Sequence, residues 1–278
     1  MHPTLFHISS FPVPSYGTML ALSFLSGILL TMHFAKQRGL DANAVADAGL
    51  YLIISAIIGA RAYYVMTHFD EFRGDLLSIV NPFQDGRIGI SGLVMYGGFI
   101  AAIITTALFF KIKKLPILPY LDAFSPGVGV GIAITRIGCF LNGCCYGLAA
   151  KGGSFLSVNY PIDVNSPAAY YQHRVGAAGL LPSQFLESAG GIVIAVTLYL
   201  VGRSKFYFAG LQFYLLIVMY AVLRFFIESV RYIETQKIGP FSHNQVICIV
   251  LFLVFGGIIV WKLKTLKSKD LKSKALKP

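Results

Sequence analysis

Seven apolar segments, each about as long as a membrane span, divide this sequence and restrict its possible folds more than any other feature. An α-helix needs about 20 mostly apolar residues to cross the hydrocarbon core of a bilayer. Only 13% of the 278 residues are charged and 56% are hydrophobic, whereas soluble domains carry about 25% charged residues. The sequence therefore predicts an all-α, polytopic membrane protein with seven transmembrane helices, over residues 16–35, 47–67, 93–112, 117–138, 183–201, 210–230 and 244–263.

The segment at 117–138 is the least apolar of the seven, because Asp122 and several glycines interrupt it. Glycine in a membrane helix lets the backbone of a neighbouring helix approach closely. We therefore expect Gly127, Gly129 and Gly131 to lie at contacts between helices.

Lysine and arginine are concentrated in alternate connections between the predicted spans. They occupy the first, third and fifth connections and the segment after the last span, which holds seven lysines from Lys262 to Lys277. Since connections rich in these residues stay in the cytoplasm, the N-terminus is expected outside and the C-terminus in the cytoplasm. The polar connection at about 148–182 predicts a small extracytoplasmic head. The expected organisation is one membrane domain over 1–265 and a Lys-rich cytoplasmic tail over 266–278.

The formal net charge of +11 would suggest nucleic-acid binding if the chain were soluble. Much of this charge stands in short clusters beside apolar segments, so orientation in the membrane explains it better. No nucleic-acid partner is expected. The basic tail is expected to lie near the anionic lipids of the inner leaflet.

Five charged residues fall inside or at the edges of the predicted spans: Arg61, Arg136, Glu187, Arg224 and Glu228. A charge at the centre of a bilayer costs at least about 2.5–3.5 kcal/mol, so such residues face a protein interior or a watery cavity. Glu228 follows Arg224 by four residues, within pairing distance on one helix face, and Arg231 is expected to continue that face. The arginines form either structural ion pairs or a site for a lipid phosphate, which guanidinium groups bind well.

Two tyrosines precede glycines at the outer ends of predicted spans, Tyr16 before Gly17 and Tyr96 before Gly97. One interpretation is that both are aromatic anchors at the membrane interface, which are common. The other is that each hydroxyl points into a cavity that opens to the outer leaflet.

Three cysteines crowd into seven residues, at Cys139, Cys144 and Cys145. A metal site is conceivable, but their spacing is not a usual zinc pattern and no histidine lies nearby, so none is predicted. No cofactor is predicted either. A disulfide of Cys139 with one of the other two, a covalent intermediate on one thiol, and simple packing of a tight turn stay open. We favour packing.

Seven stretches that contain polar residues or glycines lie in or beside these spans. In chain order they are PSYGTMLAL, IIGARAYYV, DGRIGISGLVMYGGFIAA, TRIGCFLNGCCYG, PSQFLE, RFFIESVR and FSHNQ. Together they resemble the bacterial prolipoprotein diacylglyceryl transferases over most of the chain. The resemblance implies a multi-pass enzyme of the bacterial plasma (inner) membrane. Such an enzyme moves the diacylglyceryl group of phosphatidylglycerol to the lipobox cysteine thiol of a prolipoprotein and releases glycerol phosphate.

The resemblance also implies which residues act. Arg136 matches the arginine of the signature motif, Arg224 the essential arginine of the penultimate span, and Glu228 the acidic residue four positions on. We assign catalytic roles to Arg136, Arg224, Tyr96 and Glu228, and substrate-binding roles to Tyr16, Arg136, Asn142, Gly143, Gln184, Glu187 and Arg231.

Three positions depart from the family pattern. Tyr96 stands where the family usually has histidine, Cys139 where it has asparagine, and Cys144 where it has an acidic residue. The acceptor thiol must become a thiolate, and a phenol, which titrates near 10, is a poor base for it at neutral pH. The general base therefore stays unassigned. The departures leave open a relative with a different lipid donor or acceptor, and buried arginines would also suit a non-catalytic transporter or lipid-binding scaffold.

Overall fold

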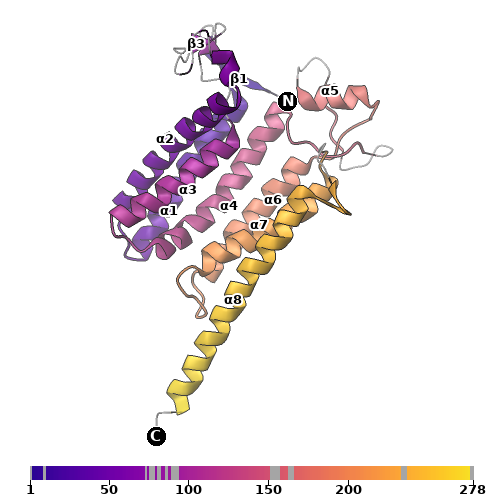
Figure 1. Ribbon diagram of the computed structural model, residues 1–278. Helices are drawn as coiled ribbons and strands as arrows, with labels where there is room; N and C mark the ends of the chain where they lie inside the picture. The colour runs from indigo at the N-terminus through magenta and orange to yellow at the C-terminus, as the bar shows by residue number, and fades with distance from the viewer. Residues whose placement is uncertain are drawn as a thin grey trace. The chain divides into compact units, whose positions relative to one another are not determined.

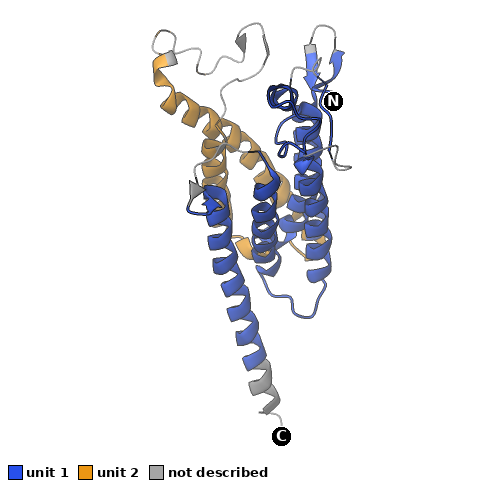
Figure 2. Ribbon diagram, turned by 90° about the vertical axis from the view of Figure 1, so that its right-hand side faces the viewer, with its two compact units in different colours: residues 1–34, 121–278 blue, residues 35–120 orange. Residues whose placement is uncertain are grey.

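The computed structural model describes residues 2–8, 11–72, 74, 79, 83–84, 87–88, 94–150, 157–161, 166–232 and 237–275 (Figure 1). The chain forms two compact units (Figure 2). The first comprises residues 1–34 and 121–278, and the second comprises residues 35–120. Parts of the predicted head, at 151–156 and 162–165, and much of the DGRIGISG motif lie outside the described residues.

The described residues form eight α-helices and six short strands, so the predicted all-α fold class is confirmed. The helices are α1 (Ser15–Gln37), α2 (Ala42–Thr67), α3 (Met95–Ile112), α4 (Ile117–Asn142), α5 (Pro167–Arg174), α6 (Ser183–Val201), α7 (Leu211–Val230) and α8 (His243–Ala275), with a 3-10 turn, η1 (Phe69–Phe72). The strands pair as three antiparallel hairpins: β1 (Thr4–Ile8) with β2 (Phe11–Pro14), β3 (Phe83–Gln84) with β4 (Arg87–Ile88), and β5 (Lys237–Ile238) with β6 (Phe241–Ser242).

Each predicted span coincides with one of these helices. Six of them, α1, α2, α4, α6, α7 and α8, are long and apolar enough to cross a membrane. The apolar part of α3, Tyr96–Ile112, is shorter, so the count of seven spans stays a prediction. Helix α8 continues to Ala275, so the described part of the lysine-rich tail is helical and continuous with the last span.

Glycines of α4 lie directly against two neighbouring helices of the first unit. A Cβ atom added to Gly127 would lie 2.9 Å from the carbonyl oxygen of Gly27 in α1. One added to Gly129 would lie 2.7 Å from the backbone nitrogen of Ala195 in α6, and one at Gly131 would lie 3.0 Å from a side chain of α1. A side chain at Gly127 or Gly129 would overlap the backbone of the neighbouring helix, and one at Gly131 would press on a side chain, so the expected close helix contacts are confirmed.

A buried aspartate fixes the start of α7 against α4. The carboxylate of Asp122, which is fully buried, accepts hydrogen bonds from the Tyr207 hydroxyl at 2.8 Å and from the backbone N–H groups of Gly210 at 2.7 Å and Phe213 at 3.0 Å. A buried carboxylate is tolerated only with such partners. Asp122, which interrupts the apolar pattern of α4, therefore makes the contact between α4 and the start of α7.

In the second unit, α2 and α3 also meet at glycines. A Cβ atom at Gly98 of α3 would lie 2.9 Å from the carbonyl oxygen of Ala56 in α2, and one at Gly59 or Gly97 would overlap the opposite helix. This pair of helices therefore depends on the close backbone approach that small residues allow.

Arg61, one of the charged residues within the predicted spans, is buried in the second unit. Its Nε donates a hydrogen bond to the carbonyl oxygen of Ile79 at 2.8 Å, and its guanidinium carbon lies 5.1 Å from the centre of the Phe72 ring. A carbonyl acceptor and an aromatic face satisfy a buried guanidinium. Arg61 therefore has a structural role in its own unit.

Candidate functional site

Four charged side chains from three helices form one buried network in the first unit. Nε of Arg136 in α4 lies 3.0 Å from Oε2 of Glu187 in α6. Nη1 of Arg224 in α7 lies 3.6 Å from Oε1 of the same glutamate, and its Nη2 lies 2.7 Å from Oε2 of Glu228. Glu187 therefore holds two arginines that come from different helices.

The carboxylates of this network are more deeply buried than the guanidinium groups. The Glu187 side chain is 0% exposed, whereas those of Arg136 and Arg224 are 18% and 15% exposed. Removing one partner of a buried ion pair costs about 3–5 kcal/mol, because the other charge is left without compensation. The glutamates therefore hold the arginines from the buried side, and both arginine side chains stay partly exposed.

Glu228 extends the network to the start of α8. Its Oε1 accepts hydrogen bonds from the Ser242 hydroxyl at 3.1 Å and from Nδ2 of Asn244 at 2.8 Å. The predicted pair between Arg224 and Glu228 is confirmed. Ser242 and Asn244 were not among the predicted site residues, although both belong to the FSHNQ stretch that carried part of the resemblance.

The chain turns back on itself directly after α4. Gly143 and Cys145 have φ angles of +71° and +61°, in the left-handed region that residues other than glycine rarely adopt. Two residues at the start of α6 hold this turn: Nε2 of Gln184 donates to the carbonyl oxygen of Cys144 at 2.9 Å, and the Ser183 hydroxyl donates to that of Cys145 at 2.8 Å. Oε1 of Gln184 is buried and has no hydrogen-bond partner among the described residues.

The same turn lies beside the end of α7. Gly147 pairs with Arg231 in an isolated β-bridge, and the backbone N–H of Leu148 donates to the carbonyl oxygen of Val230 at 2.9 Å. The prediction that Arg231 continues the helix face of Arg224 is wrong, because α7 ends at Val230 and Arg231 has extended backbone angles. Nε of Arg231 is buried and, within the described part of the chain, has no hydrogen-bond partner.

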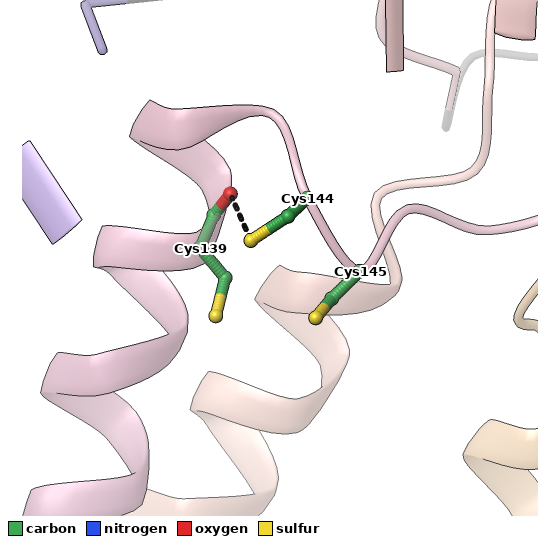
Figure 3. Close-up of side chains that lie close together, drawn as sticks. All are labelled: Cys139, Cys144 and Cys145. Atoms are coloured by element: carbon green, nitrogen blue, oxygen red, sulfur yellow. Dashed lines mark hydrogen bonds between the residues drawn. The ribbon is translucent and has the colours of Figure 1, made fainter. Parts of the chain in front are cut away.

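Three thiols lie next to Arg136. Nη1 of Arg136 donates to Sγ of Cys139 at 3.7 Å, and the sulfur atoms of Cys139, Cys144 and Cys145 all lie within 4.8 Å of one another (Figure 3). All are free cysteines, and the Cys144 thiol donates to the carbonyl oxygen of Cys139 at 3.6 Å.

The two thiols outside α4 differ in acidity. Hydrogen bonds from the Cys139 and Cys144 thiols, with the nearby charges of Arg231 and Arg136, lower the pKa of Cys145 despite its burial. For Cys144, the hydrogen bond with Cys139 lowers the pKa, but the hydrogen bond with Cys145 and burial outweigh it and raise the pKa above its usual value. Cys145 is therefore the more acidic thiol of the two.

The remaining predicted residues lie in two places. Tyr16, the second residue of α1, lies beside this cluster, since a Cβ atom on Gly138 of α4 would lie 3.6 Å from the Cα atom of Tyr16. Asn142 is the last residue of α4. Tyr96 belongs to the second unit, where it is 67% exposed.

Several membrane-length helices, three of which share a buried network of arginines and glutamates, define an integral membrane protein. The sequence profile of the family described as prolipoprotein diacylglyceryl transferase matches residues 3–261, so the chain belongs to that family. The chain is therefore a transferase and a multi-pass protein of the bacterial plasma membrane.

Individual relatives agree with this assignment. The chain is 30% identical over 273 residues to the phosphatidylglycerol--prolipoprotein diacylglyceryl transferase of Finegoldia magna, covering 97% of this chain and 100% of the relative. It is 30% identical over 267 residues to the protein of the same name from Clostridium tetani, covering 95% and 98%. A Listeria monocytogenes relative with this name is 28% identical over 266 residues, covering 94% of this chain and 90% of the relative.

Proposed function

We propose that this chain transfers the diacylglyceryl group of phosphatidylglycerol to the lipobox cysteine thiol of prolipoproteins, forming a thioether and releasing glycerol phosphate. The family membership and the names of the relatives support this donor and this acceptor. The structural observation that carries the proposal is the pair of guanidinium groups, from Arg136 and Arg224, held on one buried carboxylate, that of Glu187.

The charge of this cluster suits the lipid donor. The two arginines and two glutamates of this network balance one another, but the guanidinium groups are its more exposed charges. Arg231 adds one positive charge beside the adjoining turn, so the site offers positive charge to a phosphodiester. Guanidinium groups present paired N–H donors that match the oxygens of phosphate. At a partly buried site these interactions are stronger than they are in water.

The reaction places further demands on the arginines. The acceptor thiolate attacks the glycerol carbon next to the phosphate, the carbon–oxygen bond breaks, and the phosphate leaves with a second negative charge. Positive groups held where that charge develops stabilise the transition state. Arg136 and Arg224 take this role, while Glu187 and Glu228, which would repel phosphate, position the arginines.

The other predicted residues complete the site. Tyr16, Asn142, Gly143, Gln184 and Arg231 are proposed to bind the substrates, supported by their places around the end of α4 and α7. Tyr96 is proposed to act through a hydrogen bond from its hydroxyl to the phosphate or the ester.

The site is proposed to open toward the outer leaflet. The alternation of basic connections supports seven spans including α3, an outer N-terminus, an extracytoplasmic head over 148–182 and a cytoplasmic C-terminus. In this orientation the arginine cluster, near the ends of α4 and α7, lies in the outer half of the membrane domain at 1–265. The lysine-rich tail at 266–278 then lies beside the anionic inner leaflet.

A second candidate function is the same chemistry with a different lipid donor or acceptor. Tyr96, Cys139 and Cys144 favour it, since all three replace the residue that the family usually carries.

One assay separates the two candidates. The purified protein is incubated in micelles that contain phosphatidylglycerol and a lipobox peptide, with a peptide that has serine in place of cysteine as the control. We expect a diacylglyceryl adduct by mass on the cysteine peptide alone, with an equal amount of glycerol phosphate. Adduct formed only from another phospholipid would support the second candidate, and release of glycerol phosphate without adduct would point to another acceptor.

A further inference from the structure

The fold brings three cysteine sulfurs to one point beside the arginine cluster. Cys139 lies in the last two turns of α4, and Cys144 and Cys145 lie in the turn that follows. The left-handed backbone of Cys145 and the hydrogen bonds from Ser183 and Gln184 fix this turn, so that the sulfurs of Cys139, Cys144 and Cys145 gather around one space (Figure 3).

The separation of these sulfurs suits one thiophilic cation. All three lie within 4.8 Å of one another. Sulfurs that bind one zinc ion at about 2.3 Å lie about 3.8 Å apart in a tetrahedral site. Small side-chain rotations therefore close the cluster on a cation, and thiolate ligands select zinc and similar soft metals over magnesium or calcium.

The charge around the cluster also suits a three-thiolate site. Three thiolates and one divalent cation carry a net charge of −1. The guanidinium of Arg136, whose Nη1 lies 3.7 Å from Sγ of Cys139, places positive charge beside this site and donates to a ligand sulfur. Donors of this kind around a metal orient its ligands and tune its properties.

We propose that Cys139, Cys144 and Cys145 bind one divalent cation of the zinc class, and that its fourth coordination position takes the acceptor thiol of the lipobox cysteine. The second half rests on the proposed function. Zinc sites with three protein ligands and one open position are typical of catalysis, whereas structural sites have four protein ligands.

Such a site would supply the thiolate that the reaction needs. A thiol that coordinates zinc is deprotonated, so the acceptor would be bound as the thiolate and its proton released to solvent. The sulfur–carbon bond then forms as the carbon–oxygen bond breaks, and the electron pair leaves with the phosphate; the metal is neither oxidised nor reduced. The chain would in this way work with Tyr96 where the family usually has histidine.

The binding of metal is tested without any turnover. Co²⁺ is titrated into the reduced, metal-free full chain in detergent, and the thiolate-to-cobalt charge-transfer absorption is followed; Zn²⁺ is then added in competition. We expect one equivalent of Co²⁺ to bind to the wild-type protein. The same is expected of the control variant Cys248→Ser, which changes the one cysteine outside the cluster. Each of Cys139→Ser, Cys144→Ser and Cys145→Ser is expected to weaken binding at least about tenfold.

Binding that survives all three substitutions, or no binding at all, overturns the site. A disulfide between two of the three thiols, found by mass mapping of protein isolated from membranes without reductant, also overturns it.

The fourth position is tested on the cobalt-loaded protein by adding the lipobox peptide. We expect the cysteine peptide to shift the absorption and the serine peptide to leave it unchanged; no shift overturns this part of the proposal. The result is independent of the transfer assay. A shift without transfer would count against the proposed function, and transfer that persists in metal-free protein would count against the role of the metal.

Discussion

The fully buried carboxylate of Glu187 lies 3.0 Å from the guanidinium Nε of Arg136, on a different helix. This contact decides where the guanidinium points, because a buried carboxylate keeps a cationic partner close. The open edge of the arginine, with Nη1 toward Cys139, is therefore presented in one fixed direction.

Substitution of the buried carboxylate tests this relationship. Glu187→Gln removes the charge but keeps the shape, and it leaves two arginines without their shared partner. We expect the free energy of unfolding to fall by about 3–5 kcal/mol, as when other buried ion pairs are broken. The rate of transfer is expected to fall as well. Thermal unfolding in detergent measures the first effect, with the exposed Asp47→Asn as a control. An unchanged melting temperature would mean that the ion pairs do not hold the helices.

Arg136→Lys keeps the positive charge but loses the planar fork of donors. Because a compact ammonium cannot replace bidentate contacts to phosphate, we expect turnover to fall by about 10²–10³, the loss typical of removing one transition-state donor. The melting temperature should change little. The exposed Arg203→Lys is the matched control, and wild-type turnover by Arg136→Lys would exclude a phosphate contact by its guanidinium.

Asn244→Ala removes one of the two neutral donors to Oε1 of Glu228. A hydrogen bond to a charged group contributes about 1.5–3 kcal/mol, so we expect a lower melting temperature and slower transfer through misplacement of Arg224. Asn43→Ala, at an exposed position, serves as the control. If transfer by Asn244→Ala matched that of Asn43→Ala, Glu228 would not need its contact with α8.

Gly129→Val places a side chain where a Cβ atom would already lie 2.7 Å from the backbone of Ala195. Overpacking of this kind costs about 1–3 kcal/mol, so we expect the melting temperature to fall. Gly257→Val in α8 is the control, since a Cβ atom there meets nothing within 4 Å. Equal stability of the two variants would contradict the close packing of α4 on α6.

Tyr96→Phe separates hydrogen bonding from base catalysis. The loss of one hydrogen bond costs about 0.5–1.5 kcal/mol. We therefore expect transfer to fall by about tenfold or less, with an unchanged dependence on pH. Initial rates over a range of pH measure this, and complete loss of transfer would give the Tyr96 hydroxyl a direct part in proton transfer.

The parts of the structure that depend on local sequence could be predicted. Apolar runs of membrane length located the helices, and the spacing of four residues between Arg224 and Glu228 located their ion pair, because both follow from the geometry of one helix. The close contacts at Gly127 and Gly129 were predicted because glycine lets a neighbouring helix approach, although their partners were not predicted.

The contacts between distant segments could not be predicted in this way. Glu187 contacts Arg136 and Arg224 only once three helices have packed together, and no spacing in the sequence predicts these contacts. Arg231 was placed wrongly, since α7 ends one residue before it. The convergence of the cysteines depends on the left-handed backbone of Cys145, which is unusual for a residue other than glycine.

Asp122 and Glu187 together tie α4 to α7 at two levels. Asp122 binds the first turn of α7, and Glu187 joins Arg136 of α4 to Arg224 of α7 near the other ends of these helices. Two helices fixed at both ends resist sliding past each other. The separation of the two guanidinium groups is therefore set during folding, so a ligand that bound both of them would meet a preorganised site and would not lose affinity in ordering it.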